Sequence, residues 1–85
     1  LAIADYDRAL TYGQAFANLY FNRGTANADQ GEHRNAIRDF GQALELDPTL
    51  TKAYLARGTA YLVLGEEEKA QSDLFRHSQL TEESG

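Results

Sequence analysis

The sequence has no cysteine, no methionine and no tryptophan, and it has a single proline. Without cysteine the chain forms no disulfide, thiolate nucleophile or cysteine-ligated zinc site. No apolar run approaches the roughly eighteen residues of a membrane-spanning helix, and the longest covers residues 60–64. Lys and Arg number 8 against 13 Asp and Glu, which gives a net charge of -5. Phosphate affinity comes from clustered basic residues, so we expect no nucleic-acid partner. Because the apolar runs are short, we also expect no membrane span.

Residues able to support chemistry are equally sparse. No serine or threonine has a general base positioned beside it to make it a nucleophile, and no glycine-rich phosphate loop follows a strand. His33 and His77 are isolated histidines, and we expect His33 to be a solvated surface residue. The acidic run 66–68 opens the last predicted helix, where the helix dipole favours negative charge. The sequence therefore predicts no catalytic residue, no metal site and no cofactor.

An internal repeat of 34 residues dominates the sequence. A shift of 34 residues superposes Tyr20 on Tyr54, and the register continues without a gap. Further identical pairs are Arg23/Arg57, Gly24/Gly58, Thr25/Thr59, Ala26/Ala60, Gly31/Gly65, Glu32/Glu66, Ala36/Ala70, Asp39/Asp73 and Leu46/Leu80. The same shift places Ala2, Ile3, Asp5, Tyr6, Ala9 and Leu10 on Ala36, Ile37, Asp39, Phe40, Ala43 and Leu44. A fixed period over the whole chain indicates a repeat array.

Each repeat divides into two amphipathic helices. Gly31 and Gly65 stand midway, where positive φ can end a helix, and Pro48 ends the second helix of the middle unit. Thr49 or Thr51 is expected to cap the helix that follows. Apolar residues recur at spacings of three and four. We predict five helices at about residues 1–12, 17–30, 33–46, 51–64 and 67–80.

Specific contacts are predicted between the two helices of a hairpin. Glycine in a helix interior costs about 1 kcal/mol, so Gly24 and Gly58 mark places where a partner backbone comes close, opposite Ala36 and Ala70. Arginine and aspartate lie sixteen residues apart in both units, which predicts the ion pairs Arg23–Asp39 and Arg57–Asp73. Asn27 stands where the next unit has Tyr61, so we expect that helix end to be loosely packed.

These positions resemble a known family. The residues that carry the likeness are Tyr20, Gly24, Ala36, Phe40, Ala43 and Pro48, followed by Tyr54, Gly58, Tyr61, Ala70 and Leu74. They are similar to the signature of the tetratricopeptide repeat, a 34-residue helical hairpin. The resemblance implies an all-α, right-handed superhelix (an α-solenoid) of antiparallel helical hairpins. It implies one domain over 1–85: the second helix of a truncated repeat (1–16) and full repeats at 17–50 and 51–84. Gln14 departs from the pattern, because it replaces a proline.

The resemblance also implies where a partner binds. Tetratricopeptide arrays hold a peptide or partner segment on the concave surface, which is lined by the first helix of each repeat. Mapped by register, that surface contains Asn18, Phe21, Asn22, Thr25, Ala28 and Asp29, followed by Lys52, Leu55, Ala56, Thr59, Leu62 and Val63. Asn22 and Lys52 match two positions of a carboxylate clamp found in some members, but Ala56 replaces its arginine. We therefore expect a non-catalytic scaffold for a protein or peptide ligand, without chaperone-tail specificity.

The two ends of the chain differ in polarity. Gln71 and Ser78 replace the apolar residues that pack on a following hairpin, so we expect the array to end there. At the other end Ala2, Tyr6 and Ala9 have no hairpin partner. Two explanations stay open: earlier repeats are missing, or this face recruits a second copy. The second gives the alternative function, a structural or assembly element that forms a homodimer through the N-terminal helix face.

Overall fold

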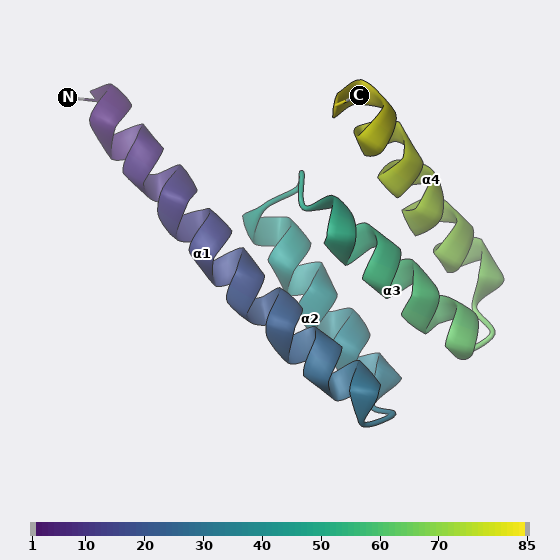
Figure 1. Ribbon diagram of the computed structural model, residues 1–85. Helices are drawn as coiled ribbons and strands as arrows, with labels where there is room; N and C mark the ends of the chain where they lie inside the picture. The colour runs from purple at the N-terminus through teal and green to yellow at the C-terminus, as the bar shows by residue number, and fades with distance from the viewer. Residues whose placement is uncertain (1, 85) are drawn as a thin grey trace.

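The computed structural model describes the backbone of residues 2–84 and the side chains of residues 13–82. Within that part the chain forms four helices, α1 (Ala2–Asp29), α2 (His33–Leu46), α3 (Thr51–Val63) and α4 (Glu67–Ser84). Helix α1 packs on α2, α2 on α3, and α3 on α4, which gives two stacked antiparallel hairpins (Figure 1). The predicted all-α solenoid is therefore confirmed.

The predicted count of five helices is wrong, because α1 continues through the expected break near residue 14 as a 28-residue helix. The turn between α2 and α3 explains the difference. There Asp47 Oδ1 accepts hydrogen bonds from Thr49 N (3.1 Å) and Thr49 Oγ1 (2.7 Å), and Pro48 cannot continue a helix. The equivalent residues 13–15 are Gly, Gln and Ala. They contain neither the aspartate that accepts these hydrogen bonds nor a proline, and Gln and Ala favour helix.

The predicted threonine cap is also absent. Thr49 gives its hydroxyl proton to Asp47, and Thr51 is the first residue of α3. Leu50 occupies the N-cap position and makes no side-chain capping hydrogen bond. The aspartate side chain before the proline therefore organises this connection, in the manner of an Asx turn.

Two glycines reverse the chain inside the hairpins, as predicted. Gly31 has φ 82° and Gly65 has φ 79°, the left-handed region that glycine adopts without penalty. After α1 the Glu32 N–H donates to the Asn27 carbonyl at 2.8 Å. After α3 the Glu66 N–H donates to the Tyr61 carbonyl at 2.9 Å. Both turns have the Schellman pattern, which satisfies the last carbonyls of the first helix and directs the second helix back along it.

The core consists mostly of small side chains. The buried apolar residues are Ala17, Ala36, Phe40, Ala43, Leu44, Ala53, Ala60 and Ala70. The predicted close approaches are confirmed. A Cβ at Gly24 would lie 2.6 Å from Phe40 Cε1 and 3.2 Å from the Ala36 carbonyl oxygen, and one at Gly58 would lie 3.1 Å from Leu74 Cδ2. The helices of each hairpin thus pack backbone against side chain, with no room for a methyl group at Gly24.

The N-terminal turns of α1 extend past the end of α2. Gly13 lies beside the last residue of α2, since a Cβ there would be 3.3 Å from the Leu46 carbonyl oxygen. Residues before Gly13 therefore run on beyond the hairpin, as the purple end of the ribbon shows (Figure 1). The side chains of Ala2, Tyr6 and Ala9, expected to lack a hairpin partner, lie outside those that the structure describes.

Substituting the two packing glycines should have unequal effects. Gly24→Ala forces a methyl group into the buried Phe40 ring, and overpacking of this kind costs about 1–3 kcal/mol. At Gly58→Ala the tight contact is with the half-buried Leu74 side chain, which can shift, while the Ala70 carbonyl oxygen lies at an ordinary 3.4 Å. Alanine also regains about 1 kcal/mol of helix propensity. Urea unfolding should show Gly24→Ala clearly destabilised and Gly58→Ala close to wild type. Equal losses in the two variants would contradict this account of the packing.

Candidate protein-binding groove

Each hairpin is held by one bidentate ion pair, as the sixteen-residue spacing predicts. Arg23 donates from Nε and Nη2 to Asp39 at 3.1 and 2.6 Å, and Arg57 donates likewise to Asp73 at 2.8 and 2.7 Å. Both aspartates are buried, so the paired guanidinium compensates a carboxylate that has lost its water. These bonds fix the register between the two helices of a repeat.

The hydrogen bonds also act on the arginines. Hydrogen bonding to Asp39 raises the pKa of Arg23, and hydrogen bonding to Asp73 raises the pKa of Arg57. A raised arginine pKa contributes stability at every pH below the unfolded value. That contribution is lost only as pH rises through the folded value, far above neutrality. The arginine side of each pair therefore gives no pH dependence near pH 7.

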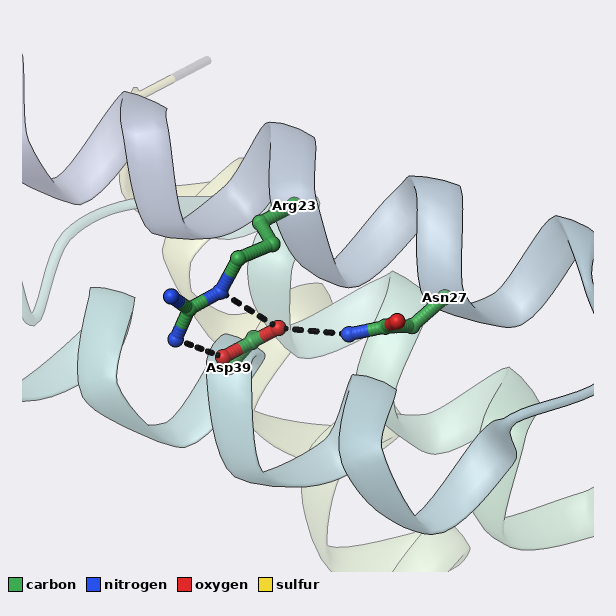
Figure 2. Close-up of polar contacts among 3 residues, drawn as sticks. All are labelled: Arg23, Asn27 and Asp39. Carbon is green, nitrogen blue, oxygen red and sulfur yellow. Dashed lines mark hydrogen bonds and ion pairs between the residues drawn. The ribbon is translucent and has the colours of Figure 1, made fainter.

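Asn27 is not the weak point that the sequence suggested. Its Nδ2 donates to Asp39 Oδ2 at 2.8 Å, so the carboxylate of the first hairpin accepts from two side chains (Figure 2). Tyr61, the residue in register with Asn27, makes a different contact, with Lys69 Nζ lying 5.7 Å from the centre of its ring. Loose packing was expected because Asn27 fills less apolar volume than Tyr61. That expectation left out Asp39, the buried hydrogen-bond acceptor on α2.

An open pocket of about 210 Å³ lies where the two repeats meet. Helix α1 contributes Thr25, Ala28 and Asp29, helix α2 contributes His33 and Phe40, and helix α3 contributes Ala56, Thr59, Ala60 and Val63. Four residues of the predicted groove set, Thr25, Ala56, Thr59 and Val63, therefore converge here. Ala28 and Asp29, expected on the same surface, join them.

The other predicted groove residues are not part of the pocket lining. Phe21 is half-buried, its ring centre lies 5.5 Å from that of Phe40, and Lys52 Nζ lies 4.8 Å from the centre of the Phe21 ring. This contact joins α1 to α3. Outside the pocket the remaining residues of the set, Asn18, Asn22, Leu55 and Leu62, are exposed. The pocket itself lies towards the end where α1 and α3 finish.

The pocket is less polar than its lining residues suggest. Thr25 Oγ1 donates to the Phe21 carbonyl at 3.0 Å, and Thr59 Oγ1 donates to the Leu55 carbonyl at 2.9 Å. The hydroxyl protons are therefore used within the helices. Polar groups with capacity for a ligand come from Asp29 and His33 at one end, and the rest of the lining is apolar. A site of this kind suits an apolar side chain held by a few polar contacts.

His33 differs from the expectation of a solvated surface residue. It is half-buried, it lines the pocket, and its Nδ1 atom is buried without a hydrogen-bond partner. The Schellman turn at Gly31 folds the start of α2 back over the end of α1 and produces this burial. Sequence spacing gave no signal for it, because His33 belongs to the second helix of the repeat, whereas the groove was mapped from first helices alone. Phe40 was missed because it also belongs to a second helix, and Ala60 was missed because it is a buried position of α3.

Within residues 13–82 no three His, Asp or Glu side chains gather in a geometry that could hold a metal ion. None of the four helices in the described part of the chain combines the length and apolarity needed to cross a membrane.

Stacked hairpins with a groove across their first helices define a helical-repeat solenoid. Residues 17–50 match the tetratricopeptide repeat family model, over the same range that the sequence predicts for the first complete unit. Residues 17–50 are thus a tetratricopeptide repeat. Repeats of this family generally mediate protein–protein interaction and are typically non-catalytic.

Solved structures with the same fold include several of MamA. The crystal structure of MamA superposes with a TM-score of 0.79 and 25% identity over 81% of this chain and 40% of its own. MamA MSR-1 C2 gives 0.78 and 30% over 81% and 40%, and a MamA mutant gives 0.74 and 30% over 75% and 47%. This chain therefore spans less than half the length of those MamA chains. No curated protein is significantly similar to the sequence.

The role of Asn27 leads to a direct stability test. Asn27→Ala removes a hydrogen bond to a buried carboxylate, which is worth about 1.5–3 kcal/mol, and regains roughly 0.5 kcal/mol of helix propensity. We expect a net loss of about 1–2 kcal/mol in urea unfolding. Asn22→Ala on the same helix is the matched control, since Asn22 is exposed, and it should be neutral or slightly stabilising. A neutral Asn27→Ala would restore the view that this helix end is loosely packed.

Proposed function

We propose that the chain is a non-catalytic protein-interaction module that binds a peptide or partner segment on the groove between α1 and α3. The observation that carries the proposal is the pocket at the junction of the repeats, where Thr25, Ala56, Thr59 and Val63 converge from two helices. An extended or helical segment that crosses α1 and α3 could insert one apolar side chain there.

The polar groups at the pocket suggest the chemistry of the segment. The buried Nδ1 of His33 lacks a partner, so a ligand backbone or side chain that hydrogen-bonds it would satisfy an orphaned group. Asp29 lines the same end of the pocket and favours a basic neighbour. At the other end Lys52 lies over Phe21 and favours an acidic one. The expected ligand therefore has an apolar anchor flanked by opposite charges.

Lys52 and Asn22 do not by themselves support binding of a free carboxylate. The position of the completing arginine is Ala56, which lines the apolar pocket. The groove is consequently better suited to an internal segment than to a chain terminus.

Self-association through the N-terminal helix, the alternative raised by the sequence, concerns a different surface. That alternative involves Ala2, Tyr6 and Ala9 in the first turns of α1, whereas the predicted groove residues of α1 begin at Asn18. Occupation of one part of α1 does not require the other part to be free.

The groove is tested by selecting ligands and then substituting its rim. A displayed library of random short peptides is panned against the wild-type chain, and selected peptides are synthesised for calorimetry. Val63→Lys places a charge beside the apolar pocket near the end of α3, where the helix dipole tolerates a cation. Burying that charge under a ligand is unfavourable, so we expect affinity to fall at least about tenfold.

Phe75→Lys is the matched control, because Phe75 is an exposed apolar residue of α4 that lies outside the pocket. It should leave the affinity of the selected peptides unchanged. Circular dichroism and urea unfolding establish that both variants are folded. Peptides that bind wild type and Val63→Lys equally well would show that the groove is not the binding site.

A further inference from the structure

A second apolar surface lies on α1, away from the groove. Phe16, Leu19, Tyr20 and Arg23 follow one another at helical spacing and line a shallow hollow of about 350 Å³. Phe16 is 53% exposed and Leu19 is 62% exposed, although both are large apolar residues. We call these four residues the α1 outer face. Exposed apolar clusters of this kind commonly mark an interaction surface.

The repeat itself shows what covers such a face. A shift of 34 residues turns the α1 outer face into Leu50, Ala53, Tyr54 and Arg57. In that repeat α2 packs on the surface: Ala53 is fully buried, and a Cβ at Gly41 would lie 3.5 Å from Arg57 Nη1. The Arg57 side chain is 23% exposed, whereas that of Arg23 is 66% exposed. The α1 outer face therefore lacks a helix of the α2 type.

One segment of the chain has the sequence of that helix. Residues 2–12 align with 36–46, and Ile3 and Leu10 take the positions of Ile37, which is half-buried, and Leu44, which is buried. The segment cannot cover the outer face of its own chain, because α1 is a single continuous helix through residues 13–16. The turn that would fold it back is not encoded there, as the comparison with Asp47, Pro48 and Thr49 shows.

We propose that two copies of this chain form a domain-swapped dimer, in which residues 2–12 of each copy cover the α1 outer face of the other. The swap exchanges a helix that an ordinary array would supply from its own preceding repeat. The linker 13–16 is the hinge, and it is helical in each copy. Such an exchange is a low-cost route to a closed, two-fold dimer.

Charge and symmetry support this occupant. If the segment packs on the outer face as α2 packs on α3, Asp7 takes the position of Gly41, which lies beside Arg57. The residue in register with Arg57 is Arg23, so Asp7 of one copy lies beside Arg23 of the other. The exchange therefore brings opposite charges together at the interface. The two α1 helices then run antiparallel and cross near residues 14–15. This point is close to the middle of the Ala2–Asp29 helix, so both halves of each helix are covered.

The proposal does not depend on ligand binding in the groove, and its tests leave the groove residues intact. Sedimentation equilibrium of the wild-type chain should show a species of twice the 9.4 kDa chain mass that dissociates on dilution. A single species of 9.4 kDa at every concentration would overturn the proposal.

Restoring the turn is the decisive variant. Gly13→Asp combined with Gln14→Pro and Ala15→Thr copies the connection between α2 and α3 into the hinge. Each chain can then fold its own N-terminal segment onto its outer face, so the variant should be a folded monomer. A variant that stays dimeric would show that the copies associate without exchanging this segment, and would contradict the swap.

Two matched pairs locate the interface. Leu19→Glu on the outer face should raise the dimer dissociation constant at least about tenfold, while Phe75→Glu, at an exposed apolar residue of α4, should leave it unchanged. Asp7→Lys should weaken the dimer and Asp5→Lys should not, because Asp5 holds the register position of Asp39, which faces the other side of α2. Equal effects within either pair would contradict the proposed packing.

Discussion

The structure depends on how closely the two helices of each hairpin approach. Gly24 and Ala36, and again Gly58 and Ala70, remove side-chain volume at the contact, so a backbone on one helix lies against small residues on the other. This spacing brings Arg23 and Arg57 within bidentate reach of buried aspartates. It also sets the width of the groove, because α1 and α3 are held apart by α2 alone along most of their length. A wider hairpin would lose both the ion pairs and the pocket floor at Phe40.

The two repeats are similar in backbone, but side chains at equivalent positions have different hydrogen-bond partners and different exposure. Asp73 accepts from one arginine, whereas Asp39 accepts from Arg23 and from Asn27. The second repeat is enclosed by α2 and the first is not, which explains why Arg23 is far more exposed than Arg57. The two repeats can therefore be compared position by position. Where one copy of a surface is covered and the other is bare, the difference identifies the kind of element that is missing.

The groove and the α1 outer face give the chain two surfaces with different chemistry. The groove is apolar with polar groups at its ends, which suits recognition of a segment from another protein. The outer face is an uncovered repeat interface, which suits a helix with the sequence of α2. A scaffold that associates through one surface and binds partners through the other would present two grooves per dimer, and avidity would then strengthen binding to a multivalent partner.

The sequence by itself determined the repeat, its 34-residue register, the helical hairpins and both ion pairs. These follow from identities at fixed spacing, from glycines that need positive φ, and from charges sixteen residues apart, all of which are local or periodic properties. Only the tertiary structure decided that α1 is continuous, that Asn27 serves the buried Asp39, and that His33 lines the pocket with an unpaired nitrogen. Whether a weak turn at residues 13–16 bends or stays helical depends on packing, and the partners of a buried polar atom depend on which side chains other helices bring beside it.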